Sequence, residues 1–128
     1  MQLACSDPKR VLVADDDAWL RPLLAELLAD EGYAVLEANS GSEALRCIRE
    51  QHPDLVVLDV ALPWRSGLAV LDELEAEEPA RRLPVVLVSG CVDLVQTGQA
   101  HRTVAAFHKP LDLAALLSRV AQTVPLAA

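Results

Sequence analysis

Five short runs of aliphatic residues, several of them rich in valine, recur along this chain with longer segments between them. The runs cover residues 11–14, 34–38, 55–58, 84–88 and 104–108. Each has the length and composition of a strand, and residues 55–58 are apolar enough to be buried on both faces of a sheet. Strands that alternate with helical segments at this spacing predict a parallel sheet covered by helices on both faces.

The segments between these runs carry apolar residues every three or four positions, as amphipathic helices do. The first helix is predicted to follow Asp17 as its N-cap and to end at Gly32. Pro22 cannot donate a backbone hydrogen bond, so the first turn is predicted to be distorted or the helix to start late. Three further helices are predicted: after the capping box of Ser40 and Glu43, over residues 68–77, and after the N-cap Asp112.

The length and composition favour one domain with an aliphatic core. The chain has 128 residues, of which 52% are hydrophobic and only 3% aromatic, so leucine, valine and alanine must fill the core. We place the domain at residues 9–124, between an extension of residues 1–8 and a tail of residues 125–128. The net charge of −8 argues against a nucleic-acid partner, because phosphate binding needs clustered lysine and arginine.

The cysteines and the hydropathy pattern predict a cytoplasmic protein. Cys5, Cys47 and Cys91 are an odd number without C-x-x-C spacing, which is typical of free thiols in a reducing compartment. The sequence shows neither the pattern of a signal peptide nor an apolar run of membrane-spanning length. We therefore expect no membrane contact.

Polar side chains follow four of the five predicted strands. Asp15 and Asp16 follow the first strand, Asp59 the third, Ser89 the fourth and Lys109 the fifth. In parallel sheets, ligands bind beyond the carboxyl ends of the strands. These five side chains are therefore predicted to share one edge of the sheet.

Three carboxylates at one edge repel one another and favour a cation. Oxygen ligands at a site that keeps water suit Mg²⁺. A carboxylate can also attack phosphorus, with Lys109 and the cation offsetting the charge of the phosphoryl group and Ser89 donating a hydrogen bond to it. Taken one by one, these residues fit ordinary caps and surface turns. Together they predict a metal-assisted acceptor of a phosphoryl group.

Four motifs occur in order at the strand ends: VLVADDD, VVLDVALPWRSG, VVLVSG and HKP. With them, roughly residues 9–124 resemble a response regulator receiver domain, the phosphoacceptor module of two-component phosphorelay signal transduction. The resemblance implies a flavodoxin-like, doubly wound, five-stranded parallel sheet in the order 2-1-3-4-5.

The resemblance also implies roles for the acidic residues. Asp59 accepts a phosphoryl group from the phosphohistidine of a sensor histidine kinase or phosphotransfer protein. Asp16, Asp59 and the backbone carbonyl of Ala61 bind Mg²⁺, and Asp15 assists through water. Asp17 is then only a helix cap.

Further implied roles concern the switch and the partners. Ser89 is the switch hydroxyl, and Lys109 contacts the phosphoryl group and precedes a cis bond to Pro110. Catalysis is limited to self-phosphorylation and dephosphorylation, so the protein is not a conventional enzyme. The expected state is a monomer or a weak, phosphorylation-dependent homodimer.

Two features depart from the family pattern. Receiver domains usually carry tyrosine or phenylalanine three residues before the lysine, where this chain has Ala106. Phe107 comes one residue later and should point to the other face of the sheet unless a bulge intervenes. The segment after Ser89 lacks a clear apolar stripe, so the fourth helix is expected to be short or irregular. We expect residues 90–104 to carry the output and to dock a partner or a second copy.

Two other readings compete. A phosphatase of the haloacid dehalogenase type needs an acidic residue at position 61, where this chain has Ala61. The chain also has no room for a cap domain. A receiver-like docking module that acts without phosphorylation is the main alternative. Loading with a small phosphodonor distinguishes a phosphoacceptor from such a module.

Overall fold

The computed structural model describes residues 8–77, 83–90 and 103–126. The described elements are β1 (Arg10–Ala14), α1 (Leu20–Glu31), β2 (Ala34–Ala38), α2 (Gly41–Gln51), β3 (Leu55–Asp59), α3 (Gly67–Glu77), β4 (Val85–Ser89), β5 (Thr103–His108) and α5 (Leu113–Thr123). All five predicted strands and four predicted helices are confirmed within about two residues. The predicted fourth helix falls on residues 91–102, outside the described part of the chain.

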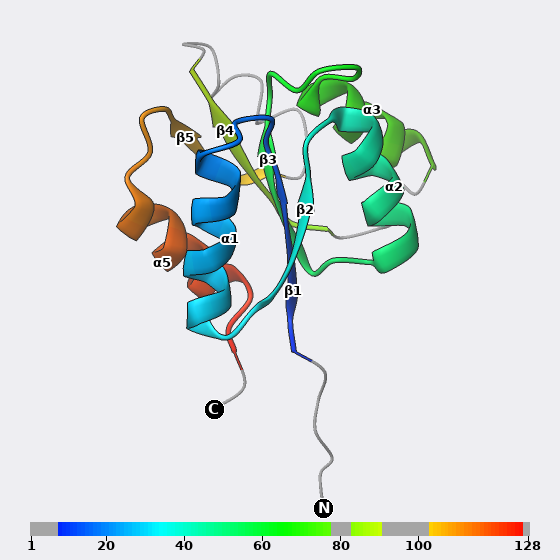
Figure 1. The fold of residues 1–128 in the computed structure, drawn as a ribbon. Helices are drawn as coiled ribbons and strands as arrows, with labels where there is room; N and C mark the ends of the chain where they lie inside the picture. Colours follow the sequence, from blue (N-terminus) through cyan, green and yellow to red (C-terminus); the bar gives the residue numbers. More distant parts are fainter. Residues whose placement is uncertain (1–7, 78–82, 91–102, 127–128) are drawn as a thin grey trace, which may run out of the picture.

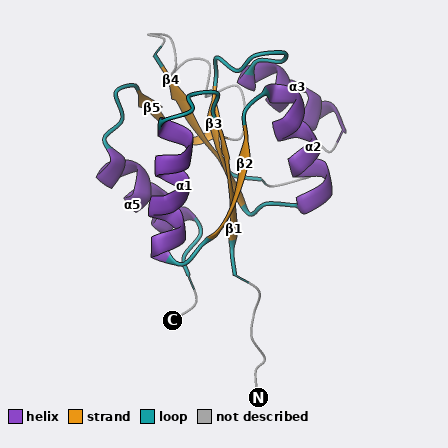
Figure 2. Ribbon diagram, viewed as in Figure 1, coloured by secondary structure: helices purple, strands orange, loops and turns teal. Residues whose placement is uncertain are grey.

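The strands form one parallel sheet in the order β2-β1-β3-β4-β5 (Figure 2). In the centre of the sheet, Val57 pairs with Val13 on one side and with Val86 on the other. Every residue of β3 and β4 is buried. The predicted flavodoxin-like order is therefore confirmed.

Helices cover both faces of the sheet, with α1 and α5 on one side and α2 and α3 on the other (Figure 1). Two apolar clusters fill the layers between helices and sheet. One contains Leu24, Leu28 and Leu116 with the strand residues that face them, and the other contains Leu45, Ile48 and Leu74. Burial of each such side chain stabilises the fold by about 1.5–3 kcal/mol.

None of the helices in the described residues is long and apolar enough to cross a membrane.

Helix α1 begins at Leu20, three residues after the last aspartate of the preceding acidic run, Asp17. Trp19 is the N-cap residue and its side chain makes no capping bond, but Asp17 Oδ1 accepts from the amides of Trp19 (2.8 Å) and Leu20 (3.0 Å). Pro22 lies in the first turn, where its missing N–H needs no partner inside the helix. The predicted late start is confirmed, and Gly32 ends the helix in the left-handed conformation (φ 112°).

Strand β5 contains a bulge. Val85 pairs with Thr103 and Val86 with Ala105, so Val104 is the extra residue. Beyond the bulge the alternation resumes: Ala106 packs on the α2/α3 side, and Phe107 packs on the α1/α5 side. The aromatic ring therefore lies on the opposite face from position 106, as expected.

Candidate functional site

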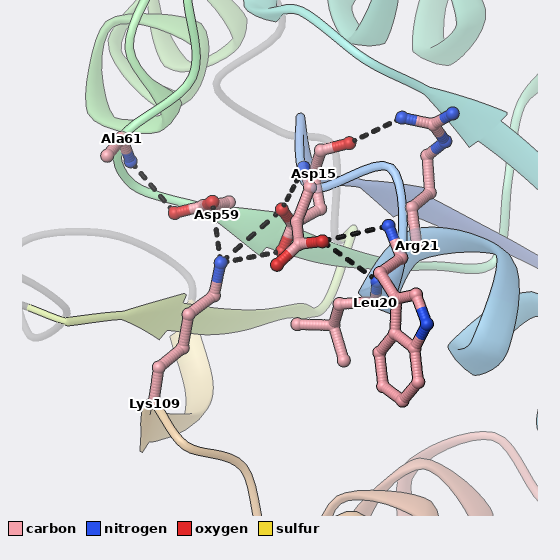
Figure 3. Close-up of polar contacts among 8 residues, drawn as sticks. Asp15, Leu20, Arg21, Asp59, Ala61 and Lys109 are labelled. Carbon is pink, nitrogen blue, oxygen red and sulfur yellow. Dashed lines mark hydrogen bonds and ion pairs between the residues drawn. The ribbon is translucent and has the colours of Figure 1, made fainter.

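Three charged side chains from three strand ends meet at the carboxyl edge of the sheet (Figure 3). Lys109 Nζ lies 3.1 Å from Asp15 Oδ2 and 3.1 Å from Asp59 Oδ2. Both aspartate side chains are only 4% exposed, whereas that of Lys109 is 26% exposed. One lysine thus bridges two buried carboxylates that are 44 positions apart in the sequence, because parallel strands end at the same edge.

A third carboxylate completes an acidic cluster. Asp15, Asp16 and Asp59 each offer one carboxylate oxygen, and these oxygens lie within 4.8 Å of one another. Asp16 is exposed, while the other two are buried. Three carboxylates against one lysine leave an excess of negative charge. All-oxygen donors, two of them held in place and one accessible, fit a hard divalent cation such as Mg²⁺.

The charges at this edge shift one another's proton affinity. Burial raises the pKa of Asp15, and the negative charge of Asp59 adds to the rise, although hydrogen bonds from the Asp17 amide and Lys109 oppose it. Burial acts to lower the pKa of Lys109, but its bonds to Asp15 and Asp59 outweigh this and raise the pKa. Lys109 therefore keeps its positive charge, whereas burial makes the charged form of Asp15 less favourable than it is in water.

Backbone contacts fix the two buried carboxylates. The amide of Asp17 donates to Asp15 Oδ1 (2.9 Å), and the amide of Ala61 donates to Asp59 Oδ1 (2.9 Å). Each side chain thus accepts a bond from a residue two positions later, which restricts its rotation. The backbone of Ala61 is thereby held beside Asp59, and its role as a carbonyl ligand stays a prediction.

The fourth strand contributes Ser89 to the same edge. Ser89 is buried, and its carbonyl accepts a hydrogen bond from the amide of Lys109 (2.9 Å). The Lys109–Pro110 peptide bond is cis, as expected. All five side chains that were predicted to share one edge therefore lie on the loops and strand ends of that edge.

The loop between β3 and α3 is held against the start of α2. Gly41 N donates to the carbonyl of Pro63 (3.2 Å). A Cβ on Gly41 would lie 1.7 Å from the carbonyl oxygen of Arg65, so only glycine fits at this contact. The loop that follows Asp59 is therefore anchored backbone to backbone.

Sequence reasoning missed Arg21. Its guanidinium donates from Nη1 to the carbonyl oxygen of Asp15 (3.0 Å) (Figure 3). Its Nε donates to Glu37 Oε1 (3.2 Å). A side chain that binds a backbone carbonyl needs no particular partner residue, so the sequence carries no signal for the contact.

An apolar cavity beside the site was also missed. It has a volume of about 540 Å³ and is lined by Asp17, Trp19, Leu20, Leu23, Lys109, Pro110, Leu111 and Leu113. Trp19 is 79% exposed at its rim. The signal was the run of apolar residues that directly follows Lys109, which sequence reasoning assigned only to a turn and a helix face.

A second tryptophan stands near the edge. Trp64, in the β3–α3 loop, is 90% exposed and has a positive φ of 68°. A bulky residue rarely adopts this conformation, so sequence reasoning had no basis to expect it.

Known proteins resemble this chain in sequence and in fold. The family model for the response regulator receiver domain matches residues 11–121. Sporulation initiation phosphotransferase F of Bacillus subtilis is 29% identical over 118 residues, covering 92% of this chain and 95% of the relative. The transcriptional regulatory protein PdtaR of Mycobacterium tuberculosis is 34% identical over 116 residues; the match covers 88% of this chain but only 55% of PdtaR.

A solved structure has the same fold. The Francisella response regulator 1452 receiver domain superimposes with a TM-score of 0.83 at 25% identity, over 91% of this chain and 96% of that one. The family match spans nearly the whole described fold, including the strand ends that carry the acidic cluster. The chain belongs to the response regulator receiver domain family.

Proposed function

We propose that Asp59 accepts a phosphoryl group from the phosphohistidine of a sensor histidine kinase or phosphotransfer protein. The observation that carries this proposal is the placement of the buried Asp59 carboxylate, which contacts Lys109 and lies close to the carboxylates of Asp15 and Asp16 on the carboxyl edge. A buried carboxylate can act as a nucleophile toward phosphorus, and the cation beside it offsets part of the negative charge of the transferred group. The change in charge at this edge then alters the contacts of the domain with other proteins.

The transfer is a substitution at phosphorus. A carboxylate oxygen of Asp59 attacks the phosphorus atom and forms a new P–O bond. The P–N bond to the donor histidine breaks, and its electron pair stays on the imidazole nitrogen. The products are an aspartyl phosphate and a free histidine, so no water or other co-reactant is consumed.

Residues around Asp59 stabilise the transferring group. Lys109 lies within hydrogen-bond distance of Asp59 and would donate to a phosphoryl oxygen on that side chain. Ser89 would donate its hydroxyl to a second oxygen. Asp16, Asp59 and the carbonyl of Ala61 would hold Mg²⁺, with Asp15 contributing through water. When bound, Mg²⁺ offsets the negative charge that develops on the phosphoryl oxygens.

The donor is proposed to be a protein rather than a small molecule. Lys109 lines both the acidic site and the apolar cavity bordered by Trp19. A donor whose histidine reaches Asp59 would therefore also cover apolar surface, which a small polar phosphodonor cannot use. We place the receiver unit at residues 9–124 and its location in the cytoplasm, where the free thiol of Cys47 stays reduced.

Phosphoryl loading tests this proposal. The protein is incubated with acetyl phosphate and Mg²⁺, and its intact mass is measured. Wild type should gain one phosphoryl group and Asp59→Asn none, whereas Asp54→Asn at the opposite edge should be loaded like wild type. Equal loading of Asp59→Asn would show that another residue is the acceptor. A wild type that is loaded neither by acetyl phosphate nor by a phosphorylated histidine protein would support the docking-module alternative.

A further inference from the structure

One arginine links the acidic loop to the neighbouring strand and helix. Arg21, in the first turn of α1, donates to the carbonyl oxygen of Asp15 (3.0 Å) and to the carboxylate of Glu37 on β2 (3.2 Å). Its side chain is 20% exposed, compared with 45% for Glu37. The guanidinium can hold two acceptors at once because its donors form a rigid, planar fork.

The bond to Asp15 acts on the peptide that carries Asp16. The carbonyl of Asp15 belongs to the planar peptide unit between these two residues, so fixing that oxygen fixes the plane. The other side of Asp15 is already held, because its amide donates to the carbonyl of Ala38 (3.0 Å). With the peptide groups on both sides of Asp15 held, the backbone at Asp16 has little freedom. The fixed backbone in turn sets the direction in which the exposed Asp16 side chain leaves it.

We propose that Arg21 is a positioning residue for the metal site: it orients Asp16 through the Asp15–Asp16 peptide. The inference rests on the proposed Mg²⁺ site. It assigns to Arg21 no contact with the metal or with the phosphoryl group.

The direction in which Mg²⁺ affinity changes when Arg21 is removed distinguishes a positioning role from a purely electrostatic one. A cationic side chain near a metal site repels the metal, so its removal should tighten Mg²⁺ binding if charge were its only influence. Loss of a residue that orients a ligand weakens metal binding, typically by 10- to 100-fold. The two accounts therefore predict opposite changes.

The test measures Mg²⁺ affinity by calorimetry and the free energy of unfolding by urea in EDTA, both on the full chain. Arg21→Ala should weaken Mg²⁺ binding by about tenfold. Glu37→Ala removes the other partner of Arg21 but leaves the bond to the Asp15 carbonyl, so it should change the affinity by less than about threefold. Both variants lose the surface ion pair, so a purely structural role would affect both alike.

Repetition in high salt adds a second signature, because salt screens a charge effect and leaves a geometric one in place. Unchanged or tighter Mg²⁺ binding by Arg21→Ala overturns the inference while leaving the proposed function intact. If Arg21→Ala does not fold, Arg21→Met provides the same reading, because its unbranched side chain keeps apolar packing but has no hydrogen-bond donor for the Asp15 carbonyl. A wild type that binds no Mg²⁺ overturns the metal site itself, and this inference with it.

Discussion

The amino and carboxyl edges of the sheet differ in how their polar groups are paired. At the amino edge, Arg10 and Asp54 exchange hydrogen bonds: the Arg10 amide donates to Asp54 Oδ2 (2.8 Å), and the Asp54 amide donates to the Arg10 carbonyl (2.8 Å). The Arg10 guanidinium also reaches the carbonyl of Gln51 (2.7 Å). At the carboxyl edge, two buried carboxylates share Lys109, and a third, exposed carboxylate lies close to them.

This difference separates stability from function within one sheet. Groups at the amino edge are exposed or half-buried and satisfy one another locally, so each contributes a little to the fold. The carboxyl edge keeps more negative charge than it neutralises, which folding alone would not favour. Substitutions at the two edges should therefore differ in size, in sign and in their response to Mg²⁺.

The largest change in stability is expected from Lys109→Ala. It removes the cation shared by Asp15 and Asp59 and leaves two buried carboxylates facing each other. The free energy of unfolding in EDTA should fall by about 2 kcal/mol, below the 3–5 kcal/mol of a fully buried pair because Lys109 is partly exposed. Urea unfolding with and without Mg²⁺ measures this, and Mg²⁺ should recover more stability than in wild type. A loss no larger than that of Arg10→Ala would contradict the contrast.

The next effect concerns metal removal. At a Mg²⁺ concentration ten times its Kd, binding should raise the free energy of unfolding by about 1.4 kcal/mol, and EDTA should abolish the gain. Asp16→Ala should lose this gain because it lacks one of the proposed ligands. Thermal and urea unfolding measure it, with Asp17→Ala as the matched control: that variant loses the bonds to Trp19 and Leu20 and should be less stable with and without metal alike. If only Asp17→Ala lost the response to Mg²⁺, the assignment of ligand and cap would be reversed.

A smaller effect of opposite sign is expected from Asp15→Asn. The folded pKa of Asp15 is raised mainly by burial, so the folded state binds its proton more tightly than the unfolded state does. Wild-type stability therefore falls as the pH rises from the ordinary aspartate pKa through the raised folded value. The Asn variant lacks this loss and should be more stable at neutral pH in EDTA, by roughly 1 kcal/mol. Urea unfolding across this pH range measures the difference, and an advantage that shrinks as the pH rises would refute it.

The smallest effect is expected at the amino edge. Asp54→Ala removes the acceptor of the Arg10 amide in a solvent-accessible position, so the free energy of unfolding should fall by only about 0.5 kcal/mol. Its response to Mg²⁺ and its phosphoryl loading should equal those of wild type. Urea unfolding and intact mass measure both, and reduced loading would mean that the two edges are coupled.

The strands and their polar ends could be predicted because the signals are local and strong. A continuous run such as residues 55–58 has few alternatives to a buried strand, and Asp59 marks its end. Parallel pairing then brings the strand ends to one edge without any knowledge of side-chain positions. The fold and the membership of the site followed from these two facts.

The missing details depend on contacts that have no sequence pattern. The bulge at Val104 shifts the register by one residue within a run that reads as an ordinary strand. Arg21 binds a backbone carbonyl, and Trp64 adopts a conformation that its own bulk disfavours. Such features are set by the geometry of neighbouring elements, which only the folded chain defines.

The contact between Gly41 and the carbonyl of Arg65 also limits how this protein can evolve. As long as the loop after Asp59 keeps its course, position 41 has one permitted amino acid, since even a methyl group would overlap that carbonyl. A lineage can change helix α2 at this point only by rebuilding the loop that follows Asp59 in the same step. Saturation mutagenesis with selection for folded protein should therefore return glycine alone at position 41, but many amino acids at the exposed neighbour Ser42.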